Sequence, residues 1–193
     1  MLFTFHEILD VLIMTIGLGF IFMNYVPAPK RENKWKDLPY NFNNTRRFDW
    51  RQMWFAALLV APAIILHELG HKFVALTFGL QATFHAAYTW LGIGVLLRLL
   101  NFGFIFFVPA YVSIAGNTAP INHALIAFAG PAVHLILFVV SILVLKKKGL
   151  RQNSFMAWTL IKRINLTLFI LNMLPIPLFD GWTVYTGLYH TLF

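Results

Sequence analysis

The pentapeptide His67-Glu68-Leu69-Gly70-His71 lies inside an apolar run of the chain, at about residues 51–79. In a helix, side chains at positions i and i+4 project from one face, so His67 and His71 can bind one cation together. The carboxylate of Glu68, beside the first histidine, can then accept a proton from a water molecule at that cation. The pattern indicates zinc-hydrolase chemistry placed inside a membrane.

The composition of the whole chain is that of a membrane protein. Of its 193 residues, 59% are hydrophobic and 11% are charged, outside the balance of soluble domains. Apolar runs long enough or nearly long enough to cross a bilayer occupy residues 5–26, 51–79, 91–109, 121–145 and 156–179. We expect an all-α polytopic protein of the cell membrane, with about four to six transmembrane segments. The connections at 27–50 and 146–155 are too short for a soluble domain, so 1–193 form a single membrane domain.

The first run begins without a Lys/Arg-rich segment and ends without a small-residue cleavage site, which indicates a retained helix. Near its start are His6, Glu7 and Asp10. We expect these three side chains at the water interface, where polar groups are least costly.

The net charge of +8 comes mainly from two loops. One contains Lys30, Arg31, Lys34, Lys36, Arg46, Arg47 and Arg51, and the other contains Lys146, Lys147, Lys148 and Arg151. In a membrane protein, such runs set the orientation or contact anionic lipid headgroups. We therefore expect membrane lipids and no nucleic acid as partners. The absence of cysteine excludes disulfides and thiolate metal ligands.

A catalytic zinc ion usually has three protein ligands and a water molecule, so the two histidines need a partner. The only carboxylate after Glu68 is Asp180, in the segment Asn172-Met173-Leu174-Pro175-Ile176-Pro177-Leu178-Phe179-Asp180-Gly181. An acidic side chain at the end of a Phe- and Leu-rich helix is costly unless it pairs or binds a cation. A zinc ion would explain Asp180.

Other histidines compete as the third ligand. His85, His123 and His190 lie near the ends of apolar segments, where we expect plain polar contacts. His134 lies deep in the run 121–145, where an unpaired imidazole would be costly. A hydrogen bond to a neighbouring helix explains His134 better than a direct role at the metal, which stays an alternative.

The two motifs can lie at the same depth in the membrane. The helix that carries His67 begins near Arg51, and the helix that carries Asn172 begins near Met156. His67 and Asn172 are therefore each 16 residues in, roughly 24 Å along their helices. Pro175 and Pro177 prevent regular helix beyond this level, so the backbone can bend Asp180 back toward the histidines.

Both helices then enter from the same side, so residues 80–155 must cross the bilayer an odd number of times. The run 121–145 crosses once and ends at three lysines. The stretch 80–120 should therefore enter and return as a re-entrant or hairpin-like element, or lie along one face of the membrane. We expect a helix at about 91–107 and an extended return through 108–116. Such backbone is tolerated at membrane depth only when it is buried in protein or lines a water-filled cavity.

Three motifs together resemble the site-2 protease family of intramembrane zinc metalloproteases: HELGH in one spanning helix, Gly130-Pro131 in another, and Asn-x-x-Pro-x-Pro-x-x-Asp-Gly at 172–181. The resemblance covers about residues 55–181. Unlike many relatives, this chain has no room for PDZ or CBS domains, so we expect a small form with a catalytic core at about 51–181. Residues 1–50 would add an N-terminal helix and a basic loop.

The resemblance implies one zinc ion per chain, held by His67, His71 and Asp180, with Glu68 as the general base. Asn172 corresponds to an asparagine that holds the substrate or the developing oxyanion. Many relatives have an amide or a small residue where this chain has His134. The implied substrate is a transmembrane helix of another membrane protein, cut within or near the bilayer in regulated intramembrane proteolysis. An extended edge within 80–116 could accept the unwound segment by strand addition.

Three alternatives share part of the motif. A membrane zinc protease with a downstream glutamate as third ligand is excluded, because no Glu follows residue 68. A metal transporter would normally have about eight spans and a second His/Asp-rich helix, which this chain lacks. A catalytically inactive, zinc-binding membrane scaffold stays open.

Two criteria disagree about the orientation in the membrane. Both basic loops fall on one side, and the positive-inside rule predicts that this side is cytoplasmic. The resemblance implies instead that the HELGH helix enters from outside and that the metal lies nearer the cytosol. For the depth of the site we follow the resemblance.

Overall fold

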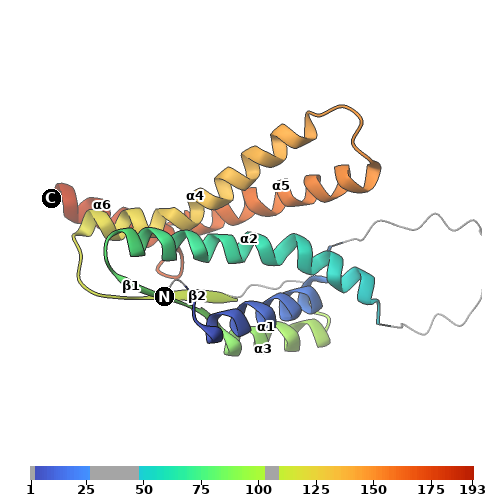
Figure 1. The fold of residues 1–193 in the computed structure, drawn as a ribbon, viewed down its shortest axis with the longest axis horizontal. Helices are drawn as coiled ribbons and strands as arrows, with labels where there is room; N and C mark the ends of the chain where they lie inside the picture. Colours follow the sequence, from blue (N-terminus) through green and yellow to red (C-terminus); the bar gives the residue numbers. More distant parts are fainter. Residues whose placement is uncertain (1–2, 27–47, 103–108) are drawn as a thin grey trace, which may run out of the picture.

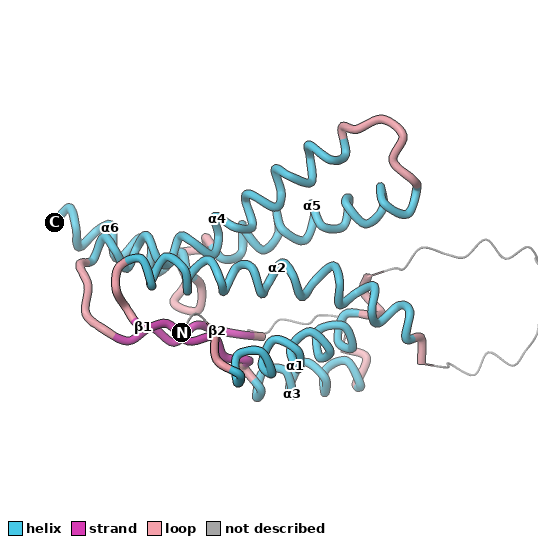
Figure 2. The backbone as a smooth tube through the Cα atoms, in the orientation of Figure 1, coloured by secondary structure: helices cyan, strands magenta, loops and turns pink. Residues whose placement is uncertain are grey.

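Six helices and two short strands make up the computed structural model, which describes residues 3–26, 48–102 and 109–193 (Figures 1 and 2). In chain order they are α1 (Phe5–Phe22), α2 (Trp50–Thr77), β1 (Gln81–Ala86), α3 (Tyr88–Leu99), β2 (Ala110–Ala115), α4 (Pro120–Leu145), α5 (Gln152–Asn172) and α6 (Asp180–Leu192). The part of the first basic loop that contains Lys30 to Arg47 lies outside the described residues.

Four of the helices, α1, α2, α4 and α5, are long and apolar enough to cross a membrane. The predicted all-α polytopic membrane architecture is thereby confirmed. The prediction for 91–109 was wrong in extent, because the helix there, α3, has 12 residues and is too short to span a bilayer. Residues 103–108 of this run lie outside the described residues.

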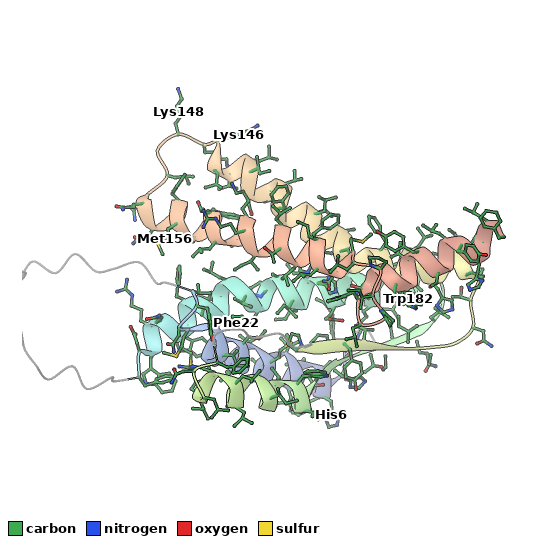
Figure 3. All side chains as sticks on the ribbon, turned by 180° about the vertical axis from the view of Figure 1, so that it is seen from behind. His6, Phe22, Lys146, Lys148, Met156 and Trp182 are labelled. Atoms are coloured by element: carbon green, nitrogen blue, oxygen red, sulfur yellow. The ribbon has the colours of Figure 1, made fainter. Side chains whose placement is uncertain are left out.

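The spanning helices alternate in direction along the long axis of the molecule. In Figure 3, Lys146, Lys148 and Met156 lie toward one end, whereas His6 and Trp182 lie toward the other. Helices α1 and α4 therefore run toward the lysine end, and α2 and α5 run away from it (Figure 1). Among the described residues between α2 and α5, α4 is the only helix that can span, which agrees with the predicted odd number of crossings.

The stretch between α2 and α4 forms the expected hairpin-like element, interrupted by α3. Strands β1 and β2 pair antiparallel, from Gln81 opposite Ala115 to Ala86 opposite Ala110. Helix α3 connects them and packs beside α1 (Figure 1). The extended return was therefore predicted correctly over 110–115.

Two carboxylates of α1 are buried against this element, which corrects the expectation that they lie at the water interface. Glu7 is 2% exposed and pairs with Lys72 of α2, which is also 2% exposed. Glu7 accepts the backbone N–H of Phe84 at 2.7 Å, and Asp10 accepts that of Ala86 at 3.2 Å. A charged pair is tolerated in such a place because each partner neutralises the other and backbone donors satisfy the carboxylates.

These bonds close one edge of the two-stranded sheet. In an antiparallel pair of strands, the backbone N–H groups along each strand point alternately toward the partner strand and away from it. The N–H groups of two residues that lie directly opposite each other point the same way, either both inward or both outward. The N–H groups of Phe84 and Ala86 on β1 point away from β2 and are already bonded to α1. Their partners in register, Val112 and Ala110, must then point their N–H groups away from β1. The edge of the sheet that α1 does not cover is therefore the outer edge of β2.

Candidate metal centre

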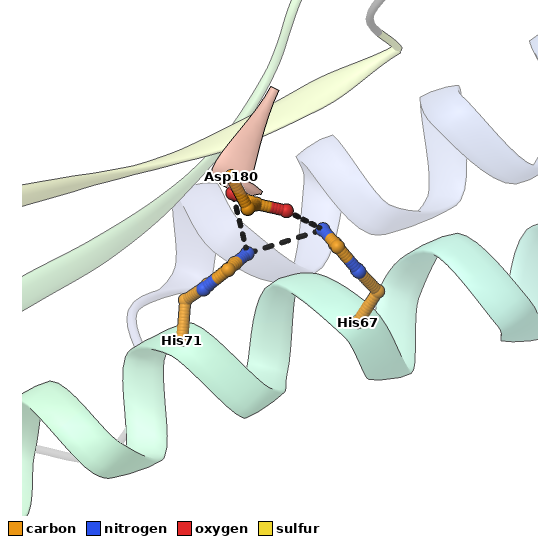
Figure 4. Close-up of side chains that lie close together, drawn as sticks. All are labelled: His67, His71 and Asp180. Atoms are coloured by element: carbon orange, nitrogen blue, oxygen red, sulfur yellow. Dashed lines mark hydrogen bonds and ion pairs between the residues drawn. The ribbon is translucent and has the colours of Figure 1, made fainter. Parts of the chain in front are cut away.

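His67, His71 and Asp180 meet between α2 and the start of α6 (Figure 4). The two histidines lie one turn apart on the same face of α2. Helix α5 ends at Asn172, and the turn that contains two prolines separates it from α6, whose first residue is Asp180. The break in the helix thus turns the carboxylate back toward α2, as predicted.

The separations of the three side chains fit a tetrahedral zinc ion. Nε2 of His67 lies 3.1 Å from Nε2 of His71, and the carboxylate oxygens of Asp180 lie 3.2 Å from the first nitrogen and 3.3 Å from the second. Tetrahedral ligands at about 2.0–2.1 Å from zinc would be roughly 3.3 Å apart. The donor set of two imidazoles and one carboxylate is also one that zinc accepts.

Burial and hydrogen bonding favour the same arrangement. The side chains of His67 and His71 are 8% and 9% exposed, whereas that of Asp180 is 24% exposed, so the site is most accessible beside the carboxylate. Nδ1 of His71 lies 2.8 Å from the carbonyl oxygen of Ile126 on α4. A carbonyl can only accept, so this nitrogen donates, and the lone pair of Nε2 faces Asp180.

A known protein is similar in sequence to most of this chain. A protein of Methanocaldococcus jannaschii, named "Putative zinc metalloprotease MJ0611", is 32% identical over 183 residues, which are 93% of this chain and 83% of that protein. The chain belongs to this zinc metalloprotease family. Neither a protein-family model nor a solved structure matches this chain.

Two predicted site residues, Glu68 and Asn172, do not belong to the group of three converging side chains. Glu68 follows His67 on α2 and is 8% exposed. Asn172 is the last residue of α5 and half-buried, and its side chain makes no hydrogen bond within the part of the chain that the structure describes. The assignment of Glu68 as base and of Asn172 as a substrate contact stays a prediction.

Three of the competing histidines lie outside the centre. His85 is on β1, where its Nε2 lies 3.1 Å from Oγ of Ser113. His123 and His190 are exposed on α4 and α6. None of the three belongs to the group of side chains, among the described residues, that could hold a metal.

His134 makes the contact expected of it and a second contact as well. Its Nδ1 lies 2.9 Å from Oδ1 of Asn165 on α5, which is the predicted hydrogen bond to a neighbouring helix. Its ring also stacks on that of His67, with the ring centroids 4.6 Å apart. His134 is therefore near the centre without being one of its three converging side chains.

Sequence reasoning missed two residues that hold histidines at or beside the centre, Ile126 of α4 and Asn165 of α5. The carbonyl of Ile126 carries no side-chain signal, so its contact with His71 could be found only in three dimensions. Asn165 did carry a signal, because it is an amide inside the apolar run 156–179. Residue 130 is a glycine for a steric reason, because a Cβ there would lie 2.6 Å from Cε1 of His67.

Proposed function

We propose that this metalloprotease is a site-2 protease, which hydrolyses peptide bonds within or near the transmembrane helices of other membrane proteins. The observation that carries the proposal is the convergence of His67, His71 and Asp180 on helices of a membrane-spanning bundle. Histidines on a helix that can span a membrane are explained by a cation, and a soluble protease would have no need of four apolar spans.

In this proposal, His67, His71 and Asp180 hold a zinc ion. When bound, zinc acts as a Lewis acid that makes water more acidic and polarises the carbonyl of the peptide bond. The anionic carboxylate offsets part of the metal's charge, while the two neutral imidazoles offset none.

Glu68 is the general base of the proposed reaction. Its carboxylate takes a proton from the attacking water and later passes it to the nitrogen of the leaving amine. Placement one residue after His67 puts it beside the metal centre rather than within it. The side-chain amide of Asn172 donates to the oxygen that becomes negatively charged during attack.

A helical substrate hides its carbonyl groups in hydrogen bonds, so it must unwind before it is cut. We propose that the unwound segment adds as a strand to the edge of β2 that faces away from β1, and not to β1, where the N–H groups of Phe84 and Ala86 are bonded to Glu7 and Asp10. The sheet lies against α2, the helix that carries both histidines.

Reconstitution tests the function directly. The purified protein is placed in lipid vesicles with a panel of single-pass membrane proteins, and mass spectrometry identifies the cut bonds. We expect cleavage within or next to the apolar segment, sensitive to a zinc chelator and restored by added zinc. Cleavage confined to soluble polypeptides such as casein would contradict an intramembrane role while leaving the metalloprotease family intact.

A further inference from the structure

The two histidines of the centre are held in different ways. Nδ1 of His71 donates to the carbonyl of Ile126, whereas Nδ1 of His67 is buried and has no hydrogen-bond partner within the described residues. A metal-ligating histidine nearly always donates its second N–H, and this bond fixes the orientation of the ring. The ring of His67 needs another support.

That support is the ring of His134 on α4. The two imidazoles are stacked, with centroids 4.6 Å apart and planes inclined by 26°. Stacked rings at this distance attract each other and restrict rotation. His134 is 1% exposed, so its ring cannot move aside without repacking its surroundings. Gly130, one turn earlier on α4, also lies close to this ring, because a Cβ there would be 2.6 Å from Cε1 of His67.

Asn165 on α5 holds His134 in turn. Oδ1 of Asn165 accepts the N–H at Nδ1 of His134 at 2.9 Å. The amide's orientation is defined because Nδ2 donates to the carbonyl of Ile161, also at 2.9 Å. Asn165 is fully buried, and an asparagine inside a helix that can span a membrane is costly unless it has such partners.

We propose that His134 is a positioning residue of the metal centre: it fixes the imidazole of His67 by stacking, and Asn165 fixes His134. The inference rests on the proposed zinc site. It gives α4 and α5 a role in orienting a histidine that belongs to α2.

Zinc affinity tests the proposal, measured by competition with a chromogenic chelator, together with the absorption spectrum of the cobalt-substituted protein. His134→Leu keeps most of the volume but removes the flat ring, and Asn165→Leu removes the acceptor that holds it. We expect each to weaken zinc binding by about 10- to 100-fold, the usual effect of losing an outer-shell partner. The cobalt spectrum should shift as well, because the ring of His67 changes its angle.

Two further variants separate positioning from general stability. His134→Phe restores a flat ring and should recover most of the zinc affinity that His134→Leu loses. Ser141→Ala is the matched control, since Ser141 is buried on the same helix and its hydroxyl donates to the carbonyl of Leu137, away from the centre. It should leave the affinity and the spectrum unchanged.

Wild-type affinity and spectrum in both His134→Leu and Asn165→Leu would overturn the positioning role, even if the free energy of unfolding falls. Equal losses in His134→Leu and His134→Phe would also overturn it, because stacking would then not be the cause. A wild-type protein that binds no zinc would refute the metal site itself and this inference with it. If the wild type binds zinc and these variants bind it with the same affinity, only the positioning role is refuted.

Discussion

At Gly130 on α4, the missing side chain leaves the space that both imidazoles occupy. A Cβ would lie 2.6 Å from Cε1 of His67 and closer still to the ring of His71. Gly130→Ala should therefore displace the rings and lower zinc affinity by at least about tenfold, in the range of outer-shell changes. Isothermal titration or chelator competition would measure the loss.

Gly92→Ala provides the control for this substitution. Gly92 is on α3, and a Cβ there would meet no atom within 4 Å. Zinc affinity should stay at the wild-type value. If Gly130→Ala also binds zinc as the wild type does, the close approach of α4 to the two histidines is not needed for the site.

At the scale of residues, the sequence was most informative where chemistry limits the choice. Asp180 could be singled out because it is the only carboxylate after Glu68. Glu7 was misplaced at the water interface because its partner, Lys72, lies far along the chain and gave no local signal. The sequence alone does not show whether a polar side chain near a helix end is buried or exposed, because this depends on partners from other parts of the chain.

Among the secondary-structure elements, the proposed addition of a substrate strand to the outer edge of β2 leads to a specific prediction. Ile114 is opposite Ala82 in a pair whose N–H groups point outward, and its side chain is 37% exposed. Ile114→Pro removes the N–H that would bond an added strand, so cleavage of a membrane substrate should fall by about tenfold or more.

Ile114→Ala is the matched variant, because it shortens the side chain but keeps the backbone N–H. Cleavage by this variant should stay near the wild-type rate, and both variants should bind zinc normally. Equal rates for the proline and alanine variants would refute strand addition at β2 and leave the metal centre untouched.

The apolar runs predicted the four long helices well, because each spanning helix needs a long apolar run. The run 91–109 was overestimated, since α3 ends at Leu99. Hydropathy does not distinguish a short helix that packs beside α1 from one that crosses a bilayer. The antiparallel pairing of β1 and β2 depends on partners distant in the sequence, and only the need for an odd number of crossings indicated it.

At the scale of the whole molecule, the start of α2 and the end of α4 lie at one end, with Arg51 and the three lysines (Figures 1 and 3). In the orientation expected of the proposed site-2 protease, this end lies outside the cytosol, against the positive-inside rule. The chain has no cysteine, so an introduced thiol reacts without background. An impermeant maleimide should label Lys147→Cys in intact cells.

His190→Cys, at the exposed end of α6, reports on the opposite end of the molecule. It should react only after the cells are permeabilised. The reverse pattern would show that the basic loops face the cytoplasm, and the metal centre would then lie nearer the outer surface.

In the proposed function, His67, His71 and Asp180 hold zinc while Glu68 performs the proton transfers of peptide hydrolysis. The most direct measurement compares Glu68→Gln with the wild type in the same vesicles, recording zinc content and cleavage of a membrane substrate together. We predict that the variant retains one zinc ion per chain and that its cleavage rate falls by at least about a hundredfold, as expected for loss of a general base. Cleavage at the wild-type rate by the zinc-loaded variant would contradict the role of Glu68 as general base.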